Sequence, residues 1–282
     1  MAVLKLKDIQ LEYEEYGRGD RWLLCCQQNH SKISNWTMEL AEKEGFHTFN
    51  ITIRGYGQST HVTEDLGEDW YDIWAQDACD FADAMGIDRF FYSGMSHGAG
   101  IGWHICVNHP ERLRGFFGVV AGPHSKNGRE TGEARMRTIN AAATPESWAA
   151  YCDEIDRNTK VVRTPEMTDA EFALKTALQA EQMAWWRGMT KEEAILNPRK
   201  PFPKLKSEEE LVAALSKIEV PTLLLGGMHD PISLPENLLR SVGAVKNAKL
   251  ILYEDATHAL DQEHQAEVVA DIAEFCRCRG LI

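Results

Sequence analysis

A pentapeptide with a glycine at each end and a serine in the middle places the strongest constraint on what this chain can fold into. The pentapeptide Gly94-Met95-Ser96-His97-Gly98 lies between a short apolar run at 89–93 and a stretch of small residues typical of a helix start. So sharp a turn forces strained backbone angles on Ser96, and only glycine fits two positions before and after it. The pattern therefore predicts a strand, a tight turn and a helix, with the Ser96 hydroxyl exposed at the carboxyl edge of a sheet.

Short apolar runs alternate with amphipathic stretches on both sides of this turn. Such alternation is typical of βα units on a parallel sheet. We expect strands at 3–11, 22–26, 47–53, 89–93, 115–121, 221–225 and 249–253, and helices at 70–85 and 263–276. The two ends of the chain thus supply one α/β sheet.

The region from 123 to 206 has a different character. Its β-branched runs are few, Ala and Glu are frequent, and helix-start signals recur, as in the capping-box spacing of Thr168 and Glu171. A length of 282 residues allows either two domains or one α/β core with a large insertion. We interpret 123–206 as a helical insertion.

Charge and cysteine content exclude several classes of protein. Lys and Arg total 30 against 43 for Asp and Glu, and a net charge of −13 repels nucleic acid and anionic lipid. The seven cysteines are odd in number and lack Cys-x-x-Cys spacing, which predicts reduced thiols in a cytoplasmic protein. The apolar start is too short for a signal peptide or a membrane span. We therefore expect no nucleic-acid and no membrane partner.

Two further residues could activate Ser96. A serine hydroxyl is a weak nucleophile that needs a general base, and the base needs an orienting carboxylate. Asp230 follows the strand at 221–225, and His258 follows the strand at 249–253. Carboxyl ends of parallel strands meet at one edge of a sheet, so we expect Ser96, Asp230 and His258 to form a catalytic triad.

With these residues in place, the chain resembles α/β-hydrolase-fold serine hydrolases over nearly its whole length. Four segments carry the resemblance: Ile53-Arg54-Gly55-Tyr56-Gly57-Gln58-Ser59, the Gly94–Gly98 elbow after Gly86-Ile87, His109-Pro110-Glu111-Arg112-Leu113, and Val220-Pro221-Thr222 with Gly227, Asp230-Pro231 and His258. The resemblance implies a mostly parallel, doubly wound sheet formed by 1–122 and 207–282. It also implies that 123–206 is a helical lid, or cap.

One segment departs from that family. Its members usually have His-Gly after the third strand, where a backbone amide helps to form the oxyanion hole, whereas this chain has Cys26-Gln27-Gln28-Asn29-His30. Backbone donors require no particular side chain, so we expect the hole to use the His97 amide and one amide from Gln28, Asn29 or His30. Which of the three donates is left open.

Other candidate residues concern substrate binding. We predict that Trp36, His229, Trp185 and Trp186 contribute to a mostly apolar pocket, although large aromatic residues are more often simply buried. The ten histidines include no His-x-His or His-x-x-x-His pair, so we predict no metal site and no cofactor. The expected partner is a small molecule with an apolar part, and a homodimer is left open.

Several reactions agree with these residues. We favour a serine esterase or lactonase that forms an acyl-enzyme on Ser96, with hydrolysis of a carbon–carbon bond in a vinylogous diketone as the alternative. A cofactor-independent dioxygenase would carry its acid after the sixth strand, where this chain has Ala121-Gly122. A hydrolase-like ligand receptor could keep an intact triad, and multiple turnover would exclude it.

Overall fold

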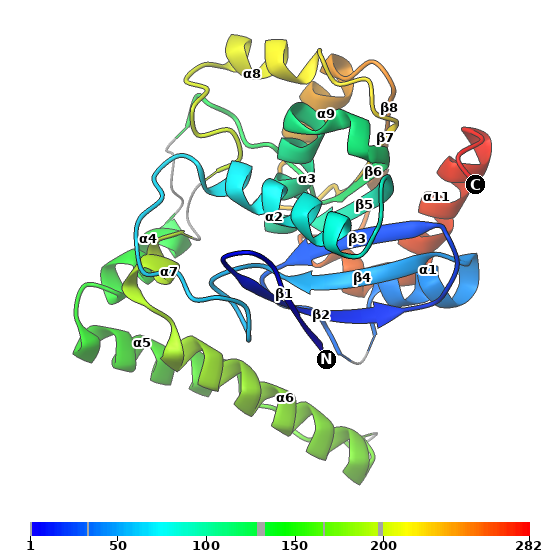
Figure 1. Cartoon of the computed structure of the whole chain (residues 1–282). Coiled ribbons are helices and arrows are strands. Elements are labelled where there is room, and N and C mark those ends of the chain that lie inside the picture. The colour runs from blue at the N-terminus through cyan, green and yellow to red at the C-terminus, as the bar shows by residue number, and fades with distance from the viewer. Residues whose placement is uncertain (1, 33, 129–132, 166, 197–199) are drawn as a thin grey trace. The chain divides into compact units, whose positions relative to one another are not determined.

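The computed structural model describes the chain except for residues 1, 33, 129–132, 166 and 197–199 (Figure 1). The chain divides into two compact units. The first, called the core unit here, comprises 1–60, 66–130 and 200–282, and the second, the helical unit, comprises 61–65 and 131–199. Residues 123–130 and 200–206, which the sequence places in the insertion, group with the core unit.

The core unit is built on one sheet. Its strands among the described residues are β1 (Ala2–Lys5), β2 (Gln10–Tyr16), β3 (Trp22–Gln27), β4 (His47–Thr52), β5 (Phe90–Met95), β6 (Leu113–Val119), β7 (Thr222–Gly227) and β8 (Ala248–Tyr253). They lie in the order β1-β2-β4-β3-β5-β6-β7-β8. The pairs β1/β2 and β2/β4 are antiparallel and all other neighbours are parallel, which confirms the mostly parallel sheet.

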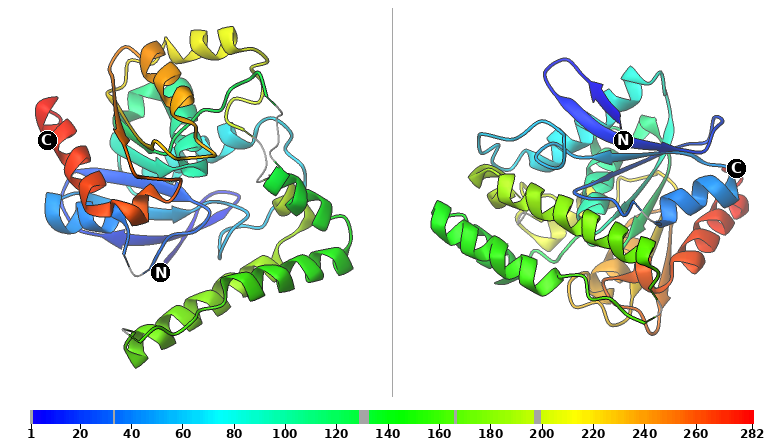
Figure 2. Two further views of the ribbon diagram at one scale, coloured as in Figure 1. Left: turned by 180° about the vertical axis from the view of Figure 1, so that it is seen from behind. Right: turned by 90° about the horizontal axis from the view of Figure 1, so that it is seen from below.

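Helices cover both faces of this sheet (Figure 2). On one face α1 (Trp36–Glu44) packs against α11 (Gln265–Cys278). On the other face lie α2 (Trp70–Ala84), α3 (His97–Asn108), α8 (Glu208–Leu215) and α9 (Pro235–Ala244). The central strands are consequently buried on both sides, which explains why β3 and β7 read as continuous apolar runs rather than alternating ones.

Two sequence predictions of element boundaries are wrong. The expected single strand at 3–11 is a hairpin, because the chain turns at the exposed charges Lys7 and Asp8, where the Leu6 N–H donates to Ile9 O at 2.8 Å. The expected helix at 263–276 is two helices, α10 (Leu260–Glu263) and α11, because the backbone of His264 is not helical, with φ −135°. Helices α1 and α9 were not predicted.

The helical unit contains α4 (Glu133–Ala141), α5 (Pro145–Thr159), α6 (Asp169–Gly188) and α7 (Lys191–Leu196). The predicted capping box at the start of α6 is confirmed: the Thr168 side chain accepts from the Glu171 N–H, and the Glu171 carboxylate accepts from the Thr168 N–H. Helices α5 and α6 pack side by side (Figure 2). The indole N–H of Trp148 on α5 donates to Trp186 O on α6 at 3.2 Å.

A buried carboxylate joins residues 61–65 to the rest of the helical unit. The Glu193 side chain is 0% exposed, and its Oε1 accepts from the Val62 N–H at 2.7 Å and lies 2.9 Å from His61 Nδ1. Its Oε2 accepts from the Thr190 N–H at 2.8 Å. Burial of a carboxylate is tolerated here because both oxygens are hydrogen-bonded.

We expect Glu193→Ala to loosen residues 61–65 and α7. The substitution leaves the Val62 and Thr190 amides without their acceptor, which costs about 3 kcal/mol of local stability. Hydrogen exchange of the backbone amides at 61–65 and 190–196 measures this as a loss of protection. Glu192→Ala, one residue along the same helix, serves as the control, and equal protection in both variants would contradict the role given to Glu193.

Candidate active site

The predicted turn around Ser96 is confirmed. Strand β5 ends at Met95, α3 begins at His97, and Ser96 between them has φ 49°, a value that residues with side chains rarely adopt. A Cβ on Gly94 would lie 2.5 Å from the Gly98 backbone, and one on Gly98 would lie 2.4 Å from Cys26 O. Both glycines are therefore required by close approach of the chain.

Three strand ends bring the predicted nucleophile, base and acid together. His258 Nε2 lies 2.9 Å from Ser96 Oγ, and His258 Nδ1 lies 2.8 Å from Asp230 Oδ2. Ser96 follows β5, Asp230 follows β7, and His258 follows β8. The imidazole thus bridges the hydroxyl and the carboxylate in one continuous hydrogen-bonded chain.

The Asp230 carboxylate is held on both oxygens. Its side chain is 0% exposed, and Oδ1 accepts from the N–H groups of Ile232 at 2.7 Å and Ser233 at 2.8 Å. Burial alone would raise the pKa of Asp230, but hydrogen bonds from His258 and these two amides outweigh it and lower the pKa below its usual value. Asp230 is therefore an anion beside His258. Aspartate is common in such turns because its side chain can accept from backbone amides that follow it in the chain.

The turn after β3 lies next to the serine turn, as the approach of Cys26 O to Gly98 shows. Two side chains fix this turn: Gln28 Nε2 donates to the Tyr56 hydroxyl at 2.9 Å, and His30 Nε2 lies 3.0 Å from Ile51 O. Burial lowers the pKa of His30 to about 4, so its ring is neutral and donates to that carbonyl. Asn29 between them is exposed.

The His97 side chain is buried in the core unit rather than aimed outward. The residue is 7% exposed, and its ring packs against Tyr71 and Trp74, with ring centroids 5.3 Å and 4.7 Å away. The His97 amide lies at the N-terminus of α3, where the helix dipole favours negative charge. Its predicted role in the oxyanion hole involves only this amide.

The residues predicted to bind substrate lie in different places. Trp36 is 4% exposed and belongs to the hydrophobic core, where its indole N–H donates to Ser93 Oγ at 2.8 Å, so a packing role is favoured over the predicted pocket role. His229 is exposed next to the acid. Trp185 and Trp186 stack edge to face on α6 in the helical unit, with ring centroids 5.1 Å apart. Substrate contact by these residues stays a prediction.

Comparison with known proteins decides the family. A family model described as the alpha/beta hydrolase fold matches residues 26–261. The chain belongs to the alpha/beta hydrolase fold family.

Solved structures of this family resemble the chain along its length. The enol-lactonase from Burkholderia xenovorans LB400 has 18% identity and a TM-score of 0.71, covering 98% of this chain and 100% of its own. A thermophilic esterase from Thermogutta terrifontis has 19% identity and a TM-score of 0.65, covering 95% and 93%. A meta-cleavage product hydrolase from Pseudomonas fluorescens IP01 has 16% identity and a TM-score of 0.65, covering 95% and 94%. At such identities the likeness shows the alpha/beta hydrolase fold.

Two other features of this alpha/beta hydrolase concern what it could bind. Among the described residues, no group of three or more His, Cys, Asp or Glu side chains is arranged to hold a metal ion. None of the helices in the described part of the chain is long and apolar enough to cross a lipid bilayer.

Proposed function

We propose that this chain is a serine hydrolase that cleaves a small or medium carboxylic ester or lactone through an acyl-enzyme on Ser96. The observation that carries the proposal is the hydrogen-bonded chain from Ser96 Oγ through His258 to Asp230, with distances of 2.9 and 2.8 Å. This order of contacts is what nucleophile, general base and orienting acid require. The esterase and enol-lactonase of the same fold support the choice of substrate class.

The reaction follows from this geometry. His258 Nε2 accepts the Ser96 proton as the oxygen attacks the carbonyl carbon, and Asp230 stabilises the imidazolium that forms. The His97 amide and one amide of Gln28, Asn29 or His30 hold the oxyanion. His258 then donates its proton to the leaving oxygen. A water molecule, deprotonated by the same ring, releases the acid and restores Ser96.

Cleavage of a carbon–carbon bond is the second candidate. The meta-cleavage product hydrolase from Pseudomonas fluorescens IP01 shares the fold over 95% of this chain, so the scaffold accommodates that chemistry. The dioxygenase alternative has less support, because His258 contacts Asp230 after β7, whereas Ala121 and Gly122 follow β6 and carry no acid.

A substrate panel combined with mass spectrometry tests the proposal. We expect turnover of short-chain esters or of a lactone, and mass spectrometry of the digested protein from quenched reactions should show an acyl adduct on the peptide that contains Ser96. Higher kcat/KM for a vinylogous diketone than for every ester and lactone would favour the second candidate. Absence of turnover on the whole panel together with absence of labelling by a fluorophosphonate would contradict a serine hydrolase.

A further inference from the structure

The segment that follows β6 is tied to the catalytic residues from several sides. The Ser96 N–H donates to Val119 O at 2.9 Å, and the Gly122 N–H donates to Ser233 Oγ at 2.8 Å. Ser233 is also the residue whose amide holds Asp230 Oδ1. Residues 119–122 are therefore bonded to both the nucleophile and the acid loop, and the next residues of the chain lie beside the site.

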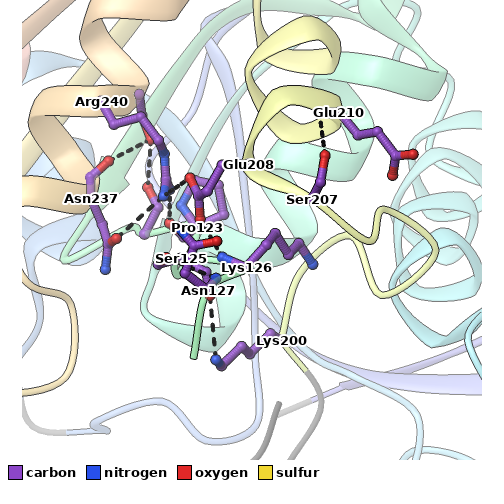
Figure 3. Close-up of polar contacts among 12 residues, drawn as sticks. Pro123, Ser125, Lys126, Asn127, Lys200, Ser207, Glu208, Glu210, Asn237 and Arg240 are labelled. Carbon is purple, nitrogen blue, oxygen red and sulfur yellow. Dashed lines mark hydrogen bonds and ion pairs between the residues drawn. The ribbon is translucent and has the colours of Figure 1, made fainter. Parts of the chain in front are cut away.

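An ion pair between a residue of α8 and a residue of α9 holds the chain just after this segment (Figure 3). Arg240 Nη1 donates to Glu208 Oε2 at 3.0 Å, and its Nη2 donates to Pro123 O. Glu208 in turn accepts from the Lys126 N–H. The side chains of Arg240 and Glu208 are 16% and 20% exposed, so solvent screens this contact less than a surface ion pair.

Two lysines link the same segment to the chain that returns from residue 200. Lys126 Nζ donates to Phe202 O at 2.7 Å and to Pro201 O at 3.2 Å. Lys200 Nζ in turn donates to Ser125 O at 3.5 Å. With the backbone held at Pro123, Ser125 and Lys126, the intervening His124 has little freedom to move.

The two ring nitrogens of His124 have no hydrogen-bond partner among the described residues. The residue is only partly accessible, yet its imidazole forms no hydrogen bond to a described residue. Burial, helped by the charges of Lys200, His258 and Arg240 and opposed by that of Asp230, lowers the pKa of His124 to about 4. The ring is therefore neutral at pH 7, with one N–H donor and one acceptor nitrogen.

We propose that His124 is a substrate-binding residue, whose ring N–H donates a hydrogen bond to an oxygen of the ester or lactone other than the scissile carbonyl. This donor is half-buried, stands on a hydrogen-bonded backbone two residues after Gly122, which is bonded to Ser233 of the acid loop, and has no partner in the described chain, so it needs an acceptor from a ligand or solvent. The proposal rests on the proposed function and specifies its substrate class: esters or lactones that carry an additional acceptor oxygen.

Matched esters test this assignment. One pair, ethyl butyrate and ethyl methoxyacetate, differs by an oxygen in the acyl part, and another, butyl acetate and 2-methoxyethyl acetate, differs by an oxygen in the alcohol part. In each pair we measure kcat/KM for both esters and divide the value for the ester with the ether oxygen by the value for the ester without it. For one of the two pairs, we expect His124→Ala to lower this ratio about 10-fold. The two esters of a pair differ in intrinsic reactivity, but this difference is the same for every variant. It therefore cancels when the ratio for a variant is compared with the ratio for the unchanged protein.

Two variants separate substrate contact from a structural role. His124→Asn keeps a donor and should recover part of the ratio, and His109→Ala, at the far end of α3, should leave it unchanged. Thermal unfolding and fluorophosphonate labelling of Ser96 should match the unchanged protein in all three variants. An unaltered ratio for both pairs in His124→Ala, or no recovery in His124→Asn, would overturn the proposal while the Ser96 label still supports a serine hydrolase. Loss of the label in the unchanged protein would instead refute the proposed function.

Discussion

Replacing Ser96 by alanine is expected to lower kcat/KM for a short-chain ester by at least about 10⁴-fold. In the proposed reaction the Ser96 hydroxyl oxygen forms the acyl bond, and alanine removes this atom but leaves the proposed backbone donors for the oxyanion. Because His258 Nε2 is 2.9 Å from Ser96 Oγ, no other hydroxyl needs to be invoked as its partner. Initial rates and the loss of the acyl adduct by mass spectrometry measure the effect.

A matched control tests whether the effect is specific to the serine in the turn. Ser93 lies three residues earlier, on β5, and its hydroxyl donates to Phe117 O and accepts from the Trp36 indole, so Ser93→Ala removes a buried hydroxyl whose partners are not Ser96, Asp230 or His258. We expect Ser93→Ala to cost stability and to retain most of the turnover. Residual activity above a tenth in Ser96→Ala would mean that Ser96 is not the nucleophile.

The strand ends that carry the candidate site could be predicted because their signal is local. Each of Ser96, Asp230 and His258 follows a short apolar run, and parallel strands bring such positions to one edge. The turn glycines added a second local signal, which the contacts of Gly94 and Gly98 confirm.

Other contacts in the two units depend on residues far apart in the chain and have no such signal. Arg240 meets Pro123 across 117 positions, and Glu193 meets Val62 across 131, so neither spacing nor periodicity indicates them. The break between β1 and β2 was missed for another reason: apolar and charged residues alternate through 3–11, and a reversal at Lys7 and Asp8 leaves that alternation almost intact.

Trp36 shows that residue type alone does not separate a packing role from a binding role. A large aromatic residue just after the turn that follows β3 could equally line a pocket or fill the core. The structure places it in the core because a buried acceptor, Ser93 Oγ, receives its indole N–H. The sequence holds no indication of that pairing, since the two residues are 57 positions apart.

Replacing Asp230 by asparagine is expected to lower kcat/KM about 10⁴-fold, and the hydrogen bonds of the acid explain why. Oδ1 accepts from the Ile232 and Ser233 amides, so the asparagine oxygen should occupy that position and its NH₂ group should face His258. His258 Nδ1 would then have to accept, which places the ring proton on Nε2. In that tautomer Nε2 cannot take the Ser96 proton.

The low pKa of Asp230 adds an electrostatic part to this effect. The carboxylate is charged at neutral pH, because its hydrogen bonds outweigh burial, and asparagine removes the charge that stabilises the imidazolium. Steady-state kinetics with a short-chain ester measures the loss, and thermal unfolding verifies the fold. Asp255→Asn is the control, since Asp255 lies near His258 in the chain but its carboxylate contacts His264 at 3.0 Å. Equal activities of the two variants would show that Asp230 does not orient the base.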